Sequence, residues 1–312
     1  MTALRRYLFA VVAVCVAFAA GIALGNGPLQ GESGGDGSVS FAAANARLGD
    51  EVRALRRAEA FDTALGSVSR PALLRGRLAG TSVGVFVLPG VSAGAVKALT
   101  TAVVTAGGDV AVVARLSASL VDPGKKTYVD SVATSSLEGA GDLKAAAALS
   151  TYPRIGVLLA RAYTGSSDAL AVDDEATRID AQLRGAKLVS LAEPLQRRAS
   201  AVVVLTAGDH GTEESVYAAH TIEVQLVDAF AHGADGLLVA GPGPASSRGG
   251  LISDVHASTA MRTAVATLDV LDLPDGKLAA VAALAAAVNG QPGAWGMRGG
   301  APAVPPGFAS GG

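Results

Sequence analysis

Sulfur ligands and aromatic rings are scarce in this sequence of 312 residues, which has one cysteine, three methionines and 4% aromatic residues. A single cysteine, Cys15, excludes an intrachain disulfide. The lack of clustered thiolates and thioethers excludes a tight site for soft metal ions. The core must therefore rely on many small contacts among Ala, Gly and Val rather than on a few large rings.

An excess of charge of one sign is also missing. The chain carries 25 Lys and Arg residues against 27 Asp and Glu residues, so its net charge is −2. Such a balance gives the whole protein no strong attraction to polyanions. We therefore expect no nucleic-acid partner.

One long apolar run is present, from Tyr7 to Gly25, with 19 residues and no charge. At 1.5 Å per residue a helix of this length spans roughly 28 Å, close to the thickness of a bilayer core. Arg5 and Arg6 precede it, and the first charge after it is Glu32. The positive-inside rule then places 1–6 in the cytoplasm. The prediction is a single-pass protein of the cytoplasmic membrane with its C-terminal part outside the cytoplasm.

A cleaved signal peptide is the alternative interpretation of this run. Ala17-Phe18-Ala19 would serve as its small-residue cleavage site. The uncleaved anchor is favoured because the apolar run continues through Ile22 and Leu24. Both interpretations export the rest of the chain.

A tether and a helical segment follow the apolar run. Residues 26–40 are rich in Gly and Ser and predict a flexible tether. Residues 41–70 predict a short coiled-coil helix. Its apolar residues stand seven, four and three apart, at Phe41, Leu48, Val52 and Leu55. Two interpretations stay open: a parallel homodimer through 41–65, or an ordinary helix packed on its own domain.

The sequence from 75 to 290 is typical of an α/β fold. Thr81–Leu88 and Asp109–Leu116 read as buried strands on either side of a helix, Ser92–Ala106, which makes a βαβ unit. Their nearly continuous apolar character favours a Rossmann-like three-layer domain with a mainly parallel sheet. Further strands are expected at 186–191, 199–206 and 236–240, further helices at 213–231 and 275–289, and mostly helix between 117 and 184. The Gly/Pro-rich segment 291–312 is expected to be disordered.

Two catalytic motifs are present only in part. Gly80 to Gly84 fits G-x-S-x-G, but its serine enters a strand instead of standing on a strand-to-helix turn. Gly124 to Thr127 resembles the end of a P-loop but lacks the earlier glycine. We therefore predict no catalytic residue and no enzymatic activity.

Two loops offer ligand-binding candidates because each follows a predicted strand, where α/β folds place ligands. Asp209 and His210 lie in the first, where Asp209 could also cap the following helix. Gly241 and Gly243 lie in the second, although the neighbouring prolines remove amide donors.

His220 and Glu223 stand three apart on one predicted helix and could share a face. Two residues on one helix do not make a metal site, so we interpret them as a solvated pair.

Several segments, in their order, resemble the mycobacterial copper transport protein B family of actinobacteria. They are Arg5-Arg6 with the span ending in Gly21–Gly27, the strand Ser82–Leu88 with Pro89, the turn Ala106–Gly108, and the stretch Asp272–Gly290. The resemblance implies a membrane segment, a coiled coil and an exported domain, and a role in copper homeostasis that lowers internal copper. The resemblance includes no motif of metal ligands, so the metal ligands are unknown. No cofactor is evident in the sequence, and copper is implied by the resemblance alone.

Two other hypotheses stand beside copper homeostasis. Relatives in corynebacteria are associated with cell separation, which implies a cell-division scaffold that regulates septal peptidoglycan hydrolases by binding an envelope or divisome partner. A third hypothesis is an exported enzyme that uses Asp209 and His210. A single apolar helix cannot form a pore alone, so copper conduction would require several copies.

Overall fold

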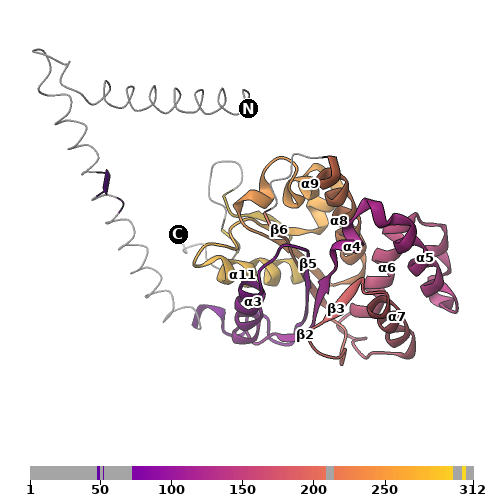
Figure 1. Ribbon diagram of the computed structural model, residues 1–312. Helices are drawn as coiled ribbons and strands as arrows, with labels where there is room; N and C mark the ends of the chain where they lie inside the picture. Colours follow the sequence, from indigo (N-terminus) through magenta and orange to yellow (C-terminus); the bar gives the residue numbers. More distant parts are fainter. Residues whose placement is uncertain (1–47, 50–51, 53–71, 209–213, 298–303, 307–312) are drawn as a thin grey trace, which may run out of the picture. The chain divides into compact units, whose positions relative to one another are not determined.

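The protein is described here by a computed structural model that covers residues 48–49, 52, 72–208, 214–297 and 304–306 (Figure 1). The predicted membrane segment 7–25 and the tether 26–40 lie outside these ranges. Most of the predicted coiled coil 41–70 does too, although Leu48, Gly49 and Val52 are helical. Within the described ranges, we find no helix with the length and apolar character needed to cross a membrane.

A seven-stranded sheet forms the centre of the domain, in the order β3-β2-β1-β4-β5-β6-β7. All neighbouring strands are parallel except β2 and β3. From β3 to β6 this is the strand order of the Rossmann fold. The predicted α/β fold with a mainly parallel sheet is therefore confirmed. The strands are β1 (Ser82–Val87), β2 (Asp109–Leu116), β3 (Val189–Leu191), β4 (Ala201–Leu205), β5 (Gly236–Ala240), β6 (Ala266–Leu268) and β7 (Ala294–Trp295).

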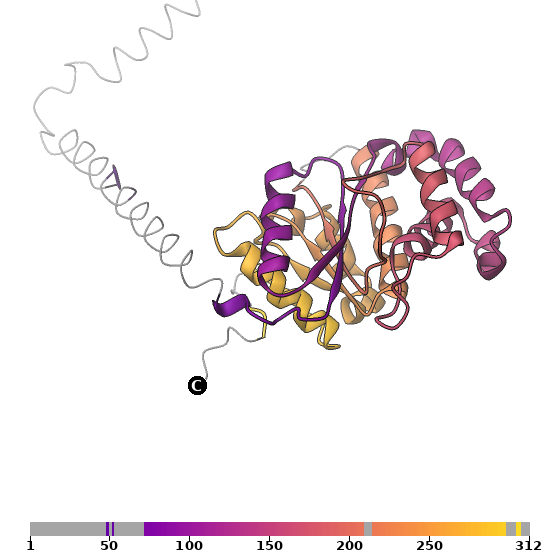
Figure 2. The same cartoon turned by 90° about the horizontal axis from the view of Figure 1, so that it is seen from below.

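Two apolar cores lie on opposite faces of this sheet. Successive side chains of a strand point to opposite faces, so Val85 packs in one core and Phe86 in the other. One face is covered by α3 (Ala93–Thr105) and α11 (Gly276–Val288), which lie side by side in Figure 2. The other face is covered by α4 (Ala118–Val121), α5 (Lys126–Leu137), α6 (Thr151–Tyr163), α7 (Asp174–Gly185), α8 (Glu214–Gly233), α9 (Leu251–Ala257) and α10 (Thr259–Ala264). Three short 3₁₀ helices, η1 (Pro123–Lys125), η2 (Gly141–Ala148) and η3 (Gly243–Ser246), complete the connections.

The strand predicted at 186–191 is shorter than expected and runs antiparallel to β2. Residues 186–188 instead end α7. Lys187 adopts a left-handed conformation with φ of 55°, and the Leu188 amide donates to the Leu183 carbonyl at 3.0 Å. This pattern is the Schellman ending of a helix, and it leaves only Val189–Leu191 for the edge strand.

The prediction that 291–312 is disordered is wrong for its first part. Residues 294–295 form β7 beside β6, a strand that the sequence analysis did not predict either. The Gly293 carbonyl accepts from the Thr267 amide at 2.9 Å, and the buried Asp269 carboxylate accepts from the Met297 amide at 2.8 Å. Backbone pairing with the edge of the sheet therefore orders a segment whose composition predicts a loop.

Candidate functional site

The sheet reverses its winding between β1 and β4. The two strands are neighbours, yet the helix after β1, α3, covers one face and the helix after β4, α8, covers the other. In open α/β sheets the crevice at the carboxyl ends of two such strands is where ligands bind. The topology of the sheet therefore places the candidate site at the carboxyl ends of β1 and β4.

A pocket of about 470 Å³ lies at this crevice. Its walls come from the loops after β1, β4, β5 and β6, from α3, and from the start of α11. The Ser92 hydroxyl accepts from the Ala95 amide at 3.2 Å and caps α3. The Thr206 hydroxyl donates to the Ala207 carbonyl at 3.1 Å. The lining residues are Gly90, Val91, Ser92, Gly94, Ala95, Ala98, Thr206, Ala207, Gly208, Pro242, Leu271, Asp272 and Lys277.

This pocket offers few polar side chains. Its two described hydroxyls are already engaged in the hydrogen bonds above, and no described lining residue is a histidine or a cysteine. Lys277 and Asp272 supply one charge of each sign at its rim. The walls suit a small, mostly apolar group with a polar end.

The first predicted ligand loop borders this pocket. Gly208, the residue before Asp209, is a lining residue, and Glu214 begins α8. Asp209 and His210 themselves lie outside the described residues. Their predicted role as ligand contacts remains a prediction.

Gly241 and Gly243 lie next to the pocket, but their backbone groups bond within the protein. The Gly241 amide donates to the Leu268 carbonyl at 2.9 Å, and the Gly241 carbonyl accepts from the Leu271 amide at 3.0 Å. A Cβ atom at Gly241 would stand 2.8 Å from the Thr206 methyl. Glycine at this position thus serves close packing of the β4 and β5 loops, and the Gly243 carbonyl accepts from Ser246.

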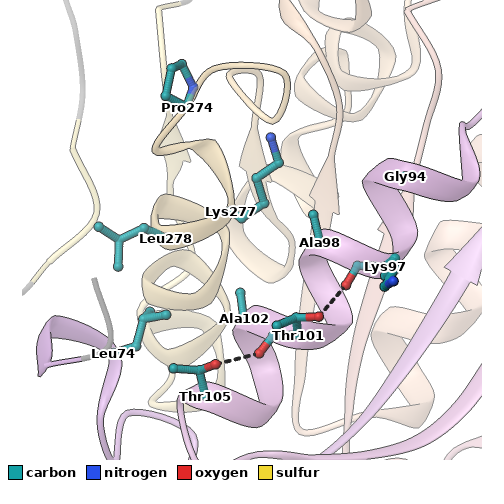
Figure 3. Close-up of a pocket in the computed structure, with 10 residues that line it drawn as sticks. All are labelled: Leu74, Gly94, Lys97, Ala98, Thr101, Ala102, Thr105, Pro274, Lys277 and Leu278. Atoms are coloured by element: carbon teal, nitrogen blue, oxygen red, sulfur yellow. Dashed lines mark hydrogen bonds between the residues drawn. The ribbon is translucent and has the colours of Figure 1, made fainter. Parts of the chain in front are cut away.

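A second hollow, of about 480 Å³, runs between α3 and α11 (Figure 3). Its α3 wall is made of small residues and threonines. The Thr101 hydroxyl donates to the Lys97 carbonyl and the Thr105 hydroxyl to the Thr101 carbonyl, both at 2.8 Å. Because these hydroxyls bond to their own helix, the groove presents mainly apolar surface. The sequence analysis predicted this helix but not the groove beside it.

His220 and Glu223 on α8 are buried, so the prediction of a solvated pair is wrong. They are 5% and 8% exposed, and the His220 Nε2 lies 4.0 Å from a Glu223 carboxylate oxygen. The sequence contains a signal that indicates this burial. Val227 and Phe230 continue the same spacing of three and four residues along one helix face, and both are buried.

The described part of the chain contains no candidate metal centre. No three His, Cys, Asp or Glu side chains there lie close enough together to hold a metal ion. The described histidines are scattered: His232 contacts the Asp228 carbonyl on the surface, and His256 contacts the Thr267 hydroxyl, both at 2.8 Å.

Comparison with known proteins identifies the family. The model of the family described as "Copper transport outer membrane protein, MctB" matches residues 1–306. The proteins named "Copper transporter MctB" of Mycobacterium bovis and Mycobacterium tuberculosis are 27% identical over 307 residues, which covers 93% of this chain and 94% of each relative. The family resemblance predicted from the sequence is confirmed: the chain belongs to the MctB copper transport family.

Proposed function

We propose that this protein acts in copper homeostasis at the cell envelope, with its α/β domain outside the cytoplasm and its N-terminus anchored in the cytoplasmic membrane by 7–25. The observation that carries the proposal is the family match over almost the entire chain. The proposed role is not enzymatic. Copper is the cargo whose level the protein lowers, and it is not a resident cofactor.

Deletion of the gene in the native host tests the copper role. The deletion strain should contain more copper per cell and grow less well in added copper, and the wild-type gene should restore both. Zinc content is the matched control and should not change. A strain lacking the gene that accumulates no copper would contradict the proposal.

The same complementation assay tests the predicted loop. A double variant, Asp209→Ala with His210→Ala, should fail to restore copper resistance if these residues contact a ligand. Full complementation by the double variant would show that neither Asp209 nor His210 is a required ligand contact.

Thiol labelling tests the proposed topology, because Cys15 is the only native cysteine. Ser167 is exposed on the domain. In a Cys15→Ser background, Ser167→Cys should react in intact cells with a thiol reagent that cannot cross membranes. Thr2→Cys, on the predicted cytoplasmic side of Arg5 and Arg6, should react only after lysis. Labelling in the opposite order would overturn the orientation.

A second candidate function is a cell-division scaffold that regulates septal peptidoglycan hydrolases. The groove between α3 and α11 favours it, because an apolar surface with its hydroxyls already bonded suits a protein partner. A homodimer through 41–65 would present two such surfaces. In this case the deletion strain should form chains of unseparated cells at normal copper content, and its copper resistance should be unchanged.

A further inference from the structure

The groove between α3 and α11 adjoins the pocket at the crevice. Gly94, Ala98 and Lys277 line both hollows. A Cβ atom at Gly94 would meet only the Ser92 hydroxyl, at 3.9 Å, so the space beside this glycine is open. The two hollows therefore form one elongated cleft along α3, which we call the α3 cleft.

The groove part of the α3 cleft has a different chemical character at each end. Lys97 of α3 and Lys277 of α11 both line it, and Figure 3 shows Lys277 extending from α11 toward α3. Leu74, Leu278 and Thr105 lie toward the opposite end (Figure 3). The groove thus has a cationic end, next to the crevice, and an apolar end.

No described carboxylate offsets the positive charge inside the groove. Asp272 lines the crevice pocket but not the groove. Among the described residues, no salt bridge engages Lys97 or Lys277. The Lys277 ammonium donates to the Leu273 carbonyl at 3.4 Å. An anion at this end would therefore be attracted by both lysines.

The walls of the groove offer few hydrogen bonds to an occupant. The hydroxyls of Thr101 and Thr105 donate to carbonyls of their own helix, and backbone groups within a helix bond to each other. An extended peptide would leave its amides unpaired here, which costs free energy. A hydrocarbon chain has no such groups. The volume of about 480 Å³ also lies in the range of small-molecule sites, about 300–1,000 Å³.

We propose that the α3 cleft binds a free long-chain fatty acid. Its hydrocarbon chain lies along the groove toward Leu74, and its carboxylate lies beside Lys277 and Lys97. A fatty acid has one chain and one terminal negative charge, which matches one groove with one cationic end. The proposal concerns the domain alone and does not depend on the copper role. A protein partner over the same groove is the competing occupant.

Photocrosslinking of the full-length protein in its native membranes tests the proposal, with a palmitate analogue that carries a photoreactive group on its chain. Mass spectrometry should map the crosslinks to peptides from α3 and α11. Excess palmitate should reduce this labelling several-fold. Palmitate methyl ester, which lacks the charge, should compete less well. Phosphatidylglycerol that competes as well as palmitate would overturn the assignment to a free fatty acid.

Gly94→Leu should block the cleft without disturbing the fold. The space beside Gly94 is open, and leucine has a higher helix propensity than glycine. Labelling of α3 and α11 should fall several-fold, while the midpoint of thermal unfolding should not fall. Val104→Leu is the matched control, because this side chain is 60% exposed on α3 and does not line the groove. It should leave the labelling unchanged.

Lys277→Gln provides a second, independent variant. It should weaken the labelling and narrow the difference in competition between palmitate and its methyl ester. Lys144→Gln, at an exposed lysine of η2, should do neither. Equal labelling of α3 and α11 in the wild type, Gly94→Leu and Lys277→Gln would overturn the proposal. Crosslinks confined to the predicted membrane segment 7–25 would also overturn it and would leave the groove to a protein partner.

Discussion

Phe86 is the ring at the centre of the larger core, and its removal should be among the most damaging single changes in the domain. It is fully buried on β1. Its ring centroid lies 4.2 Å from that of Phe230 on α8 and 5.9 Å from that of Tyr163 on α6. In a chain with 4% aromatic residues, these three rings join the sheet to two helices.

Phe86→Ala should lower the free energy of unfolding by about 4–5 kcal/mol, the upper part of the range for Phe-to-Ala changes in cores, because two ring contacts are lost with the buried area. Domains are stabilised by only about 5–15 kcal/mol. Urea unfolding followed by circular dichroism should show a midpoint lowered by about 1.5 M, for an m-value near 3 kcal/mol per M.

Val104→Ala is the matched control, because this α3 side chain is 60% exposed. It should change stability by less than about 0.5 kcal/mol. Phe86→Leu should fall between the two. The reasoning would be refuted if Phe86→Ala cost no more than Val104→Ala.

Three further predictions concern a buried carboxyl, a glycine and a helix cap. Asp254→Asn should stabilise the protein at neutral pH but not below about pH 4. Burial raises the pKa of this carboxyl above its ordinary value of about 3.9, so ionising it in the folded state costs stability as the pH rises. Urea unfolding at several pH values checks this, and an effect independent of pH would contradict it. Gly296→Ala should separate β7 from β6, because φ is +121° there and the new Cβ would overlap the Asp269 carboxylate. The fluorescence of Trp295, the only tryptophan, should then shift. An unchanged emission spectrum would argue against this separation. Ser92→Ala should cost about 0.5–2 kcal/mol by removing the cap of α3, which thermal unfolding would measure as a lower midpoint.

The regular part of the fold could be predicted from the sequence because its signals are local. Asp109–Leu116 and Gly236–Ala240 are apolar strands bounded by turn residues, and both were predicted with their observed limits. The helix after β1 begins after a serine cap and ends before Gly107, which has a positive φ of 82°. Such caps and glycines act within a few residues, so the sequence alone displays them.

The short edge strands could not be predicted, because they depend on distant partners. β6 and β7 have three and two residues, too few for an alternating pattern to be recognised. β7 forms because the carboxylate of Asp269 and the edge of β6 are in place to bond with it. Those contacts join residues more than 20 positions apart and leave no local signal.

The same difference between local signals and distant contacts applies to the candidate site. The position of the two ligand loops at the carboxyl edge of the sheet could be predicted, since it follows from the strand pattern. The internal bonding of Gly241 could not, because it depends on Leu268, at the end of a three-residue strand that the pattern does not reveal, and on Leu271 in the turn after that strand. The burial of His220 and Glu223 could have been predicted from the apolar residues that share their helix face.

Cellular copper content tests the central proposal most directly. We predict that deletion of the gene raises copper per cell, that the wild-type gene returns it to normal, and that zinc content stays constant throughout. Unchanged copper together with chains of unseparated cells would contradict the copper role and favour the cell-division scaffold.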